Sequence, residues 1–506
     1  MLRSLARRGA HSATWPLTKI VATIGPASEQ LPMLSQVVDA GMRIMRINFS
    51  HATYDEADLR ATNIKLCKGV SMATRGTKTN LRAVMLDTQG PEIRTGSFAN
   101  KVKEVELKSG DDVVLTTDPS AREQQSDKLI WLSYDRVHEN VKKGTPILLD
   151  DGAIEVIVER FDGKNLYCKV ANSGTLGNKK GVNMPGTKVL LPAISDKDKQ
   201  DLRWGVKNDI DFIAASFIRK ASDIAEIRAY VSTLMAELQP AGHPHPLIIS
   251  KIESTEAMEN FDSILEATDA IMVARGDLGV EIPIETLCPV QKEIVRKSNV
   301  AGKPVIVATQ MLESMQKNPR PTRAECTDVA NAVFDGADCV MLSGESAKGK
   351  YPVGAVSMMN KIVVEAEKTL GDNDASAQAM SDGSPLEGLA CSVAEAAYSL
   401  EALACIVVLA DGLATPAALS KFRPGVPIVA FVPDEKTGRF LQIYRGVHPV
   451  VATTDMMEEG ADPLTVAVEH AMIMKFCQPG DNIIVVAPTQ GNATLSPSLT
   501  MRIVNL

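Results

Sequence analysis

Residues 247–277 read LIISKIESTEAMENFDSILEATDAIMVARGD, and this stretch decides the fold. Two apolar runs, Leu247–Ile252 and Ala270–Ala274, are short and rich in β-branched residues, as buried strands are. A helical pattern separates them, so the stretch predicts the strand–helix–strand unit of a parallel sheet. Both runs end in charged residues, which places candidate chemistry at the ends of the strands.

The same alternation recurs through most of the chain. Six further apolar runs have strand character, and helical patterns such as Ser222–Glu237 and Ile284–Ala301 follow most of them. These six runs are Lys19–Ile24, Arg43–Phe49, Arg82–Asp87, Phe212–Phe217, Pro304–Thr309 and Asp338–Ser343. Eight strands in alternation with helices predict an α/β protein with a closed (β/α)8 TIM barrel rather than an open sheet.

The third unit of the barrel is interrupted. Residues 89–190 contain short strands, turns and glycines in place of helical patterns. The strand candidates there are Val102–Leu107, Asp112–Leu115, Pro146–Leu149, Ala153–Glu159 and Leu166–Val170. This β-rich segment predicts an inserted domain beside the mouth of the barrel, which is the position of a lid.

A second, smaller α/β domain is predicted after the barrel. Residues 371–385 are polar and read as a linker, and five apolar runs then alternate with helical stretches. These runs are Ala404–Leu409, Pro427–Phe431, His448–Val451, Asn482–Ala487 and Met501–Val504. The predicted division is 1–17 for a leader or extension, 18–88 and 191–370 for the barrel, 89–190 for the insert and 371–506 for the C-terminal domain.

The composition excludes several classes of protein. Of the 506 residues, 45% are apolar and 23% charged, as expected of a soluble protein that forms a core. The net charge of −8 gives no reason to expect nucleic acid or an acidic membrane as a partner. No apolar run approaches the length needed to span a bilayer. The eight cysteines include no Cys-x2-Cys pair, which favours a reduced compartment such as the cytoplasm.

The first 17 residues allow two interpretations. They contain Arg3, Arg7 and Arg8 with serines, apolar residues and no acid, which is the composition of a transit peptide that directs a protein to the mitochondrial matrix. The alternative is a short disordered extension of a cytoplasmic protein.

The polar residues at the predicted strand ends are expected to share one rim of the barrel, where such barrels carry their catalytic residues. Glu253 and Asp277 come from adjacent strands and supply carboxylate oxygens, which Mg2+ or Mn2+ binds together with phosphate oxygens. The alternative is an ion pair of these acids with Lys251 or Arg275. Because Lys251 lies two residues before Glu253, both side chains point to the same side of a strand. An ammonium group is thus expected beside the metal, where a phosphoryl group or an enolate gains charge.

A second set of rim residues carries oxygen atoms but only one full charge. It consists of Asn48, Ser50, Asp87 and Thr88, from neighbouring strands. Such a set suits a weakly held monovalent cation. The alternative is a hydrogen-bonded network that contains no ion.

Three apparent motifs do not support other functions. Residues 344–351, GESAKGKY, nearly match a P-loop, but Tyr351 stands where Ser or Thr must reach Mg2+. The glycines and Lys348 of this segment are still able to help bind a phosphate. No G-x-G-x-x-G follows a predicted strand, which disfavours a nicotinamide dehydrogenase. His243 and His245 lie in a proline-bounded loop and are expected at the surface.

From Thr18 to Leu506 the sequence resembles the pyruvate kinases. The segments that carry the resemblance are Thr18–Glu29 (TKIVATIGPASE), Gly41–Thr53 (GMRIMRINFSHAT), Leu86–Ser97 (LDTQGPEIRTGS), Ser250–Thr255 (SKIEST), Met272–Ile284 (MVARGDLGVEIPI), Ala308–Gln316 (ATQMLESMQ) and Arg320–Lys350. The resemblance implies transfer of a phosphoryl group from phosphoenolpyruvate to ADP, which gives pyruvate and ATP, the last step of glycolysis. It also implies dependence on Mg2+ or Mn2+ and on K+, a mobile lid and a homotetramer.

The resemblance also assigns roles to single residues where they match the family. It implies that Arg46 contacts the phosphoryl group, that Lys251 stabilises this group and the enolate, and that Thr309 takes part in catalysis with them. The other implied roles are Glu253 and Asp277 as ligands of the divalent cation, Gly276, Asp277 and Thr309 as substrate contacts, Asn48, Ser50, Asp87 and Thr88 as ligands of K+, and Asn48, His51, Arg94 and Lys180 as nucleotide contacts. Glu92 matches the acidic form of the motif found in potassium-dependent members.

The sequence departs from the family pattern in a few places. Gln89 replaces the usual Lys of the DTKGPEIRTG signature, and Ser346 replaces the usual Thr. Residues 409–416 (LADGLATP) and the final loop 489–499 lack the cationic and hydroxyl groups of a phosphate nest, which argues against strong activation by fructose 1,6-bisphosphate.

Two other functions remain open at this point. A barrel lyase or mutase that uses Mg2+ and an enolate would not need the predicted nucleotide contacts. A catalytically silent paralogue would not need the set formed by Lys251, Glu253, Asp277 and Thr309.

Overall fold

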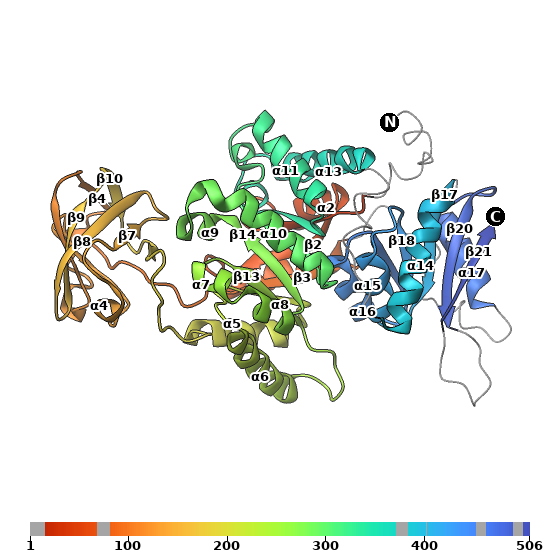
Figure 1. Ribbon diagram of the computed structural model, residues 1–506, viewed down its shortest axis with the longest axis horizontal. Coiled ribbons are helices and arrows are strands. Elements are labelled where there is room, and N and C mark those ends of the chain that lie inside the picture. Colours follow the sequence, from red (N-terminus) through yellow and green to blue (C-terminus); the bar gives the residue numbers. More distant parts are fainter. Residues whose placement is uncertain (1–15, 68–80, 371–382, 401, 452–461, 489–498) are drawn as a thin grey trace.

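A computed structural model describes residues 16–67, 81–370, 383–400, 402–451, 462–488 and 499–506. Three bodies follow one another along the long axis: a β-rich insert, a barrel and a C-terminal α/β domain (Figure 1). The predicted fold class is confirmed. The predicted leader (all but its last two residues), most of the linker after residue 370 and nearly all of the loop 489–499 lie outside the described residues. Among the described residues, no helix is long and apolar enough to cross a membrane.

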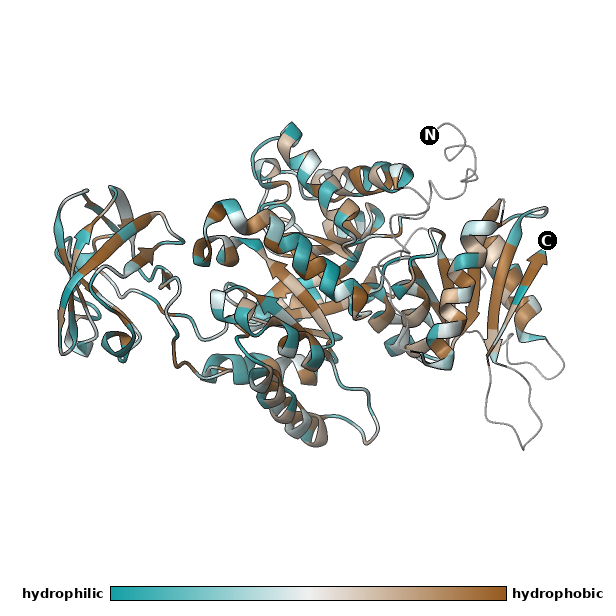
Figure 2. Ribbon diagram, in the orientation of Figure 1, coloured by the Kyte–Doolittle hydropathy of each residue, from teal (hydrophilic) through white to brown (hydrophobic). Residues whose placement is uncertain are grey.

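The barrel is a closed parallel sheet of eight strands. In hydrogen-bonded order these are β1 (Lys19–Thr23), β16 (Cys339–Leu342), β15 (Val305–Ala308), β14 (Ala270–Ala274), β13 (Leu247–Ile252), β12 (Phe212–Ala215), β3 (Ala83–Asp87) and β2 (Met42–Asn48). Nearly all of their residues are buried on both faces, which explains why they read as continuous apolar runs. In Figure 2 the strands are the brown centre of this body.

Helices surround the barrel and cover its apolar outer face. They are α2 (Leu31–Asp39), α3 (Tyr54–Leu66), α5 (Asp196–Lys207), α6 (Ala221–Leu238), α7 (Thr255–Glu259), α8 (Phe261–Ala267), α9 (Arg275–Glu281), α10 (Leu287–Val300), α11 (Arg323–Asp335), α12 (Gly344–Ala347) and α13 (Pro352–Thr369). Thr53, Ser195 and Thr322 form capping boxes that fix where α3, α5 and α11 begin. The predicted helix 222–237 is α6, and the predicted helix 284–301 is a short 3-10 turn followed by α10.

The insert has its own apolar core and two antiparallel sheets. The larger sheet has the order β11 (Val182–Asn183), β7 (Pro146–Leu149), β8 (Ile154–Asp162), β9 (Asn165–Val170), β5 (Asp112–Thr116) and β6 (Leu129–Trp131), in which only the β5–β6 pair is parallel. The smaller sheet pairs β10 (Gly174–Gly177) with β4 (Glu104–Leu107), and α4 (Val137–Asn140) is a single turn. Two extended connections join the insert to the barrel (Figure 1).

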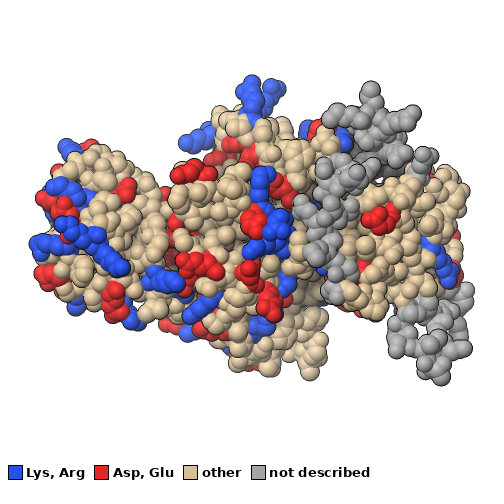
Figure 3. All heavy atoms as spheres, viewed as in Figure 1, with Lys and Arg blue, Asp and Glu red and all other residues tan. Residues whose placement is uncertain are grey.

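The C-terminal domain is a five-stranded sheet with helices on both faces. Its order is β19 (Val447–Val451), β18 (Ile428–Val432), β17 (Leu403–Leu409), β20 (Asn482–Pro488) and β21 (Leu499–Asn505), and only β21 is antiparallel. The helices are α14 (Pro385–Ser399), α15 (Ala414–Lys421), α16 (Glu435–Phe440) and α17 (Pro463–Ile473). On the face drawn in Figure 3, charges of both signs mix over the insert and the barrel and are sparse over this domain.

Candidate active site

A cavity of about 430 Å³ opens at the carboxyl ends of the barrel strands, and residues of the insert also line it. The predicted site residues in its lining are Arg46, Asn48, Ser50, His51, Asp87, Arg94, Lys180, Lys251, Glu253 and Asp277. Thr88, Gly276 and Thr309 lie outside the lining. A Cβ atom added to Gly276 would be 2.9 Å from Cγ2 of Thr309, so these two residues lie directly against each other.

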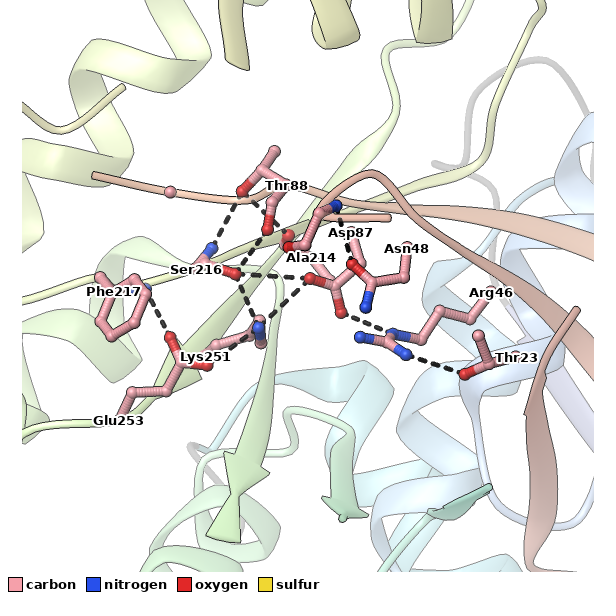
Figure 4. A network of polar contacts seen from close by, with 12 residues as sticks. Thr23, Arg46, Asn48, Asp87, Thr88, Ala214, Ser216, Phe217, Lys251 and Glu253 are labelled. Atoms are coloured by element: carbon pink, nitrogen blue, oxygen red, sulfur yellow. Dashed lines mark hydrogen bonds and ion pairs between the residues drawn. The ribbon is translucent and has the colours of Figure 1, made fainter. Parts of the chain in front are cut away.

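Asp87, at the end of β3, links two cations of the rim (Figure 4). Arg46 donates from Nε to Oδ2 of Asp87 at 2.6 Å and from a terminal nitrogen to the hydroxyl of Thr23 at 2.8 Å. Lys251 donates to Oδ1 of Asp87 at 3.2 Å. Burial alone would raise the pKa of Asp87, but Arg46 and Lys251 bring it below its ordinary value, so this carboxylate keeps its charge.

Lys251 is a buried ammonium group that is surrounded by acceptors. It donates to Oγ of Ser216 at 2.6 Å and lies 2.8 Å from Oε1 of Glu253. Burial by itself would lower its pKa, but Asp87, Glu253 and Asp277 outweigh this and raise it above the ordinary value. The side chain therefore stays charged at every physiological pH, which suits the compensation of negative charge and not proton transfer.

Glu253 and Asp277 place an excess of negative charge opposite this ammonium. Their carboxyl groups lie within hydrogen-bonding reach of each other, and the backbone N–H of Phe217 donates to Oε2 of Glu253 at 2.5 Å. Oε1 of Glu253 is buried and makes the ion pair with Lys251 without a directed hydrogen bond. Burial raises the pKa of Glu253 to about 7 and also raises that of Asp277.

These two acids fit a divalent cation. Two buried carboxylates that repel each other are what a hard cation relieves, and Mg2+ takes one or two carboxylates together with substrate oxygens. Among the residues that the structure describes, no group of three or more His, Cys, Asp or Glu side chains could hold a metal ion. A cation at this pair would therefore depend on other ligands for the rest of its coordination sphere.

The alternative interpretation is that Glu253 and Asp277 form structural ion pairs with Lys251 or Arg275. Lys251 does form an ion pair with Glu253, but Arg275 binds other groups. Arg275 makes two hydrogen bonds to Asp328, at 2.6 and 2.7 Å. It also donates to the carbonyl oxygens of Ala308 and Thr309, at 3.1 and 2.7 Å. Arg275 thus holds the end of β15, where Thr309 has a φ of +77°. This left-handed conformation is rare for a β-branched residue.

The four residues predicted to bind a monovalent cation are close together but already share hydrogen bonds. Oδ1 of Asn48 accepts from the N–H of Ser50 at 3.0 Å, and Oγ1 of Thr88 accepts from the N–H of Ser216 at 3.1 Å. Asp87 faces Arg46 and Lys251. The predicted ligands thus already take part in hydrogen bonds and an ion-pair network, and they remain predicted ligands of a monovalent cation.

The predicted nucleotide contacts come from both sides of the cavity. Arg94, in the insert, forms an ion pair with Glu92 and donates to the carbonyl of Lys179 at 2.9 Å. Lys180 lies 2.9 Å from Asp150. His51, on the barrel side, has a pKa below its ordinary value because of burial first and then of the nearby cation of Lys348. The insert side of the cavity therefore carries two cations, each already paired with an acid, and the barrel side carries both acids and cations.

Comparison with known proteins decides the family. The family model described as "Pyruvate kinase, barrel domain" matches residues 15–356, and the one described as "Pyruvate kinase, alpha/beta domain" matches residues 387–503. The chain belongs to the pyruvate kinase family. It is 44% identical to a cytosolic pyruvate kinase isozyme of Nicotiana tabacum over 493 residues, which cover 93% of each protein.

Pyruvate kinases of other organisms are also similar to this chain. Identity to the Geobacillus stearothermophilus enzyme is 43% over 95% of this chain and 79% of the relative. Identity to pyruvate kinase PKLR of Homo sapiens is 42% over 93% of this chain and 82% of the relative. The chain is thus a phosphotransferase of glycolysis, in a family whose substrates are phosphoenolpyruvate and ADP and which generally depends on Mg2+ and K+.

Sequence reasoning missed four residues that complete this pyruvate kinase rim: Thr23, Ser216, Phe217 and Asp328. Thr23 and Ser216 are the polar residues at or just after the ends of β1 and β12, and neither carries a charge. A search of strand ends for hydroxyl groups as well as charges would have found both. The backbone N–H of Phe217 and the partner of Arg275, 53 residues away, left no signal in the sequence.

Proposed function

We propose that this chain transfers the phosphoryl group of phosphoenolpyruvate to ADP at the rim of the barrel and so forms pyruvate and ATP. One observation carries the proposal. Arg46 and Lys251 converge on the same cavity as the acid pair Glu253 and Asp277, and Asp87 links the two cations. Phosphoryl transfer requires charge compensation and positioning more than covalent chemistry, and this arrangement supplies both.

Glu253 and Asp277 would hold Mg2+ or Mn2+. When bound, the cation supplies positive charge to the oxygens of the phosphoryl group and of the enolate. Because the two carboxyl groups already lie side by side with raised pKa values, they are suited to exchange a shared proton for a cation.

Arg46 and Lys251 compensate the charge on the moving phosphoryl group. Arg46 offers the planar fork that matches phosphate oxygens, and its contacts with Asp87 and Thr23 fix its orientation. Lys251 then stays beside the enolate oxygen that transfer leaves behind. Gly276 and Thr309 contact the substrate, and the absence of a side chain at Gly276 leaves room for Thr309.

The remaining assignments follow the same proposal. Asn48, Ser50, Asp87 and Thr88 bind K+, which complements the single carboxylate of that set. Asn48, His51, Arg94 and Lys180 contact ADP, so that closure of the insert over the barrel brings the nucleotide to the phosphoryl group.

We also propose the domain division at residues 17, 88, 190 and 370, a homotetramer and a cytoplasmic location. The location is supported by relatives whose names specify a cytosolic isozyme. The mitochondrial alternative depends on residues 1–17, and all but the last two of these lie outside the described residues.

A coupled assay tests the function. The purified chain is incubated with phosphoenolpyruvate, ADP, Mg2+ and K+, and pyruvate is measured through lactate dehydrogenase and NADH. We expect steady oxidation of NADH that stops when ADP is omitted. Pyruvate formation that continues without ADP would indicate a lyase or phosphatase, and no pyruvate under any condition would indicate a silent paralogue.

A further inference from the structure

The loop 216–220 leads from β12 into α6 and contacts both the catalytic rim and the insert. Its first two residues reach the rim, where Ser216 accepts from Lys251 at 2.6 Å and the N–H of Phe217 donates to Glu253 at 2.5 Å. Ser216 also donates to the carbonyl of Thr88 at 2.7 Å. Figure 4 shows Ser216 and Phe217 between Thr88 on one side and Lys251 and Glu253 on the other.

The first connection to the insert packs on the start of this loop. Gly90 has a φ of +76°, and its N–H donates to Oδ1 of Asp198 at 3.0 Å. A Cβ atom at Gly90 would be 2.8 Å from Cβ of Ser216 and 2.9 Å from the ring of Phe217. Only glycine allows so close an approach in this conformation. A shift of the first connection would therefore press on the two residues that hold Lys251 and Glu253.

The second connection is held by Arg219, near the end of the loop. Arg219 is 5% exposed, and its two terminal nitrogens donate to three backbone carbonyls of that connection. The distances are 2.9 Å to Val189, 2.6 Å to Leu191 and 3.2 Å to Pro192. Three carbonyls of a segment without helix or sheet thus obtain their hydrogen bonds from a single guanidinium group. The N–H of Leu190 in the same segment donates to the hydroxyl of Tyr134 at 3.0 Å.

The position of Arg219 is fixed from the barrel side. Its N–H donates to Asp223 at 3.0 Å, and its carbonyl accepts from Asn260 at 2.9 Å. Asp223 also lies 3.8 Å from Nε of Arg219 and is buried at the start of α6. The loop is therefore anchored to the barrel while it holds the connection, so it is able to transmit a displacement in either direction.

We propose that Arg219 is a positioning residue for phosphoryl transfer. It fastens the second connection of the insert to the loop whose Ser216 and Phe217 orient Lys251 and Glu253. The position of the insert over the cavity and the position of the catalytic groups are thereby coupled. This inference rests on the proposed function, because it assigns Arg219 a part in the same reaction.

Substitutions of Arg219 distinguish a role in positioning the second connection from a role in stability alone. Arg219→Met keeps much of the apolar stem but removes every donor to the three carbonyls. Arg219→Lys keeps a charge and donors, although an ammonium cannot reproduce the fork. The matched control is Arg439→Met, which removes another largely buried arginine. Arg439 binds Asp209 and Asp211 at the opposite end of β12 and lies far from the insert.

Kinetic constants and local amide exchange are measured for all three variants and for the wild type. Since a displacement near 1 Å at a reacting centre costs up to about a hundredfold in rate, we expect Arg219→Met to lower kcat by about ten- to a hundredfold. The KM for ADP should rise more than the KM for phosphoenolpyruvate, because the insert carries Arg94 and Lys180. Arg219→Lys should recover part of the loss. Hydrogen–deuterium exchange should accelerate over residues 186–191 in Arg219→Met only.

The outcomes that overturn the inference are distinct. Wild-type kcat, KM and exchange in Arg219→Met would refute it. An equal loss in Arg439→Met, with faster exchange throughout the barrel and no recovery in Arg219→Lys, would reduce Arg219 to a stabilising residue and also refute it. If the wild type itself made no ATP, the proposed function would be wrong and the role of Arg219 with it. An active wild type beside an unaffected Arg219→Met would refute this inference alone.

Discussion

The two ends of the barrel both contain buried acids, but these acids have different surroundings. At the end that faces the C-terminal domain, Asp211 is fully buried and every oxygen is occupied. Its Oδ2 accepts from the N–H of Val84 at 2.8 Å, and its Oδ1 lies 2.9 Å from Arg439 and 3.1 Å from Lys436. Lys436 and Arg439 belong to α16, so these contacts attach the C-terminal domain to the barrel.

At the catalytic end the acids outnumber their fixed partners. Glu253 and Asp277 both lie near the single ammonium group of Lys251, which also interacts with Asp87 and Ser216. The pKa values of Glu253 and Asp277 are raised. A buried carboxylate whose oxygens all have cationic or N–H partners stabilises the fold. A buried pair of carboxylates whose negative charge is only partly balanced by neighbouring cations is suited to bind a cationic ligand. The following predictions test this contrast, in order of their expected effect on turnover.

Lys251→Met should have the largest effect. The loss of the ammonium leaves the phosphoryl group and the enolate without their nearest fixed charge, and kcat should fall by about two to three decades. Circular dichroism and thermal unfolding should show an intact fold. Wild-type turnover in this variant would remove Lys251 from the reaction.

Withdrawal of K+ should have the next largest effect. If Asn48, Ser50, Asp87 and Thr88 bind the cation, its absence shifts Asp87 and the two cations that it holds, and turnover should fall by about ten- to a hundredfold. Rates are compared in buffers that contain potassium, sodium or choline at equal ionic strength. Equal rates in all three would contradict the assignment of these ligands.

The affinity for Mg2+ should depend on pH. Because burial raises the pKa of Glu253 to about 7, the carboxyl holds a proton below that pH, and a metal must displace it. The apparent Kd for Mg2+ should therefore rise by about tenfold per unit as the pH falls below about 7, and level off above it. Titration calorimetry measures this, and Glu253→Gln serves as the variant without the titrating group. A Kd that stayed constant between pH 5.5 and 8 would show that Glu253 is not a ligand.

Asp211→Asn should change turnover least. The substitution breaks a buried ion pair at the far end of the barrel and should lower the free energy of unfolding by about 3 kcal/mol. Because it lies away from the rim, kcat at 25 °C should stay within about twofold of the wild type. Denaturant unfolding and the coupled assay measure the two quantities. A loss of kcat without a loss of stability would contradict the inference that the acids at the far end serve stability and not turnover.

The fold was predictable because each barrel strand is buried on both faces and is punctuated by polar residues. All eight strands lie within two residues of their predicted bounds, as do the five predicted strands of the C-terminal domain. In the insert, β6, β10 and β11 were missed. Each has only two to four residues, and segments such as GTLG show no alternation of apolar and polar residues.

Charges at strand ends were the strongest signal for the residues that line the cavity. Arg46, Lys251, Glu253 and Asp277 stand at strand ends, and the barrel topology alone brings strand ends together. Thr23 and Ser216 occupy equivalent positions, but neither carries a charge and the family resemblance assigned neither of them a role. Two further features depend on packing between segments that are distant in the sequence, so no local pattern predicts them. These are the ion pair of Arg275 with Asp328 and the hydrogen bonds of Arg219 to three backbone carbonyls.

The isolated bridge between Arg94 and Gly181 has a consequence for how the chain folds. In the barrel β3 pairs with β12, although the whole insert lies between them. The bridge joins segments near the two ends of the insert, so a folded insert leaves two tethers, residues 88–93 and 182–211, in place of the whole connection 88–211. Shortening the effective loop between β3 and β12 from about 120 to about 40 residues saves about 1 kcal/mol of closure entropy. The folded insert thereby works as an internal cross-link that lowers the entropic cost of pairing β3 with β12.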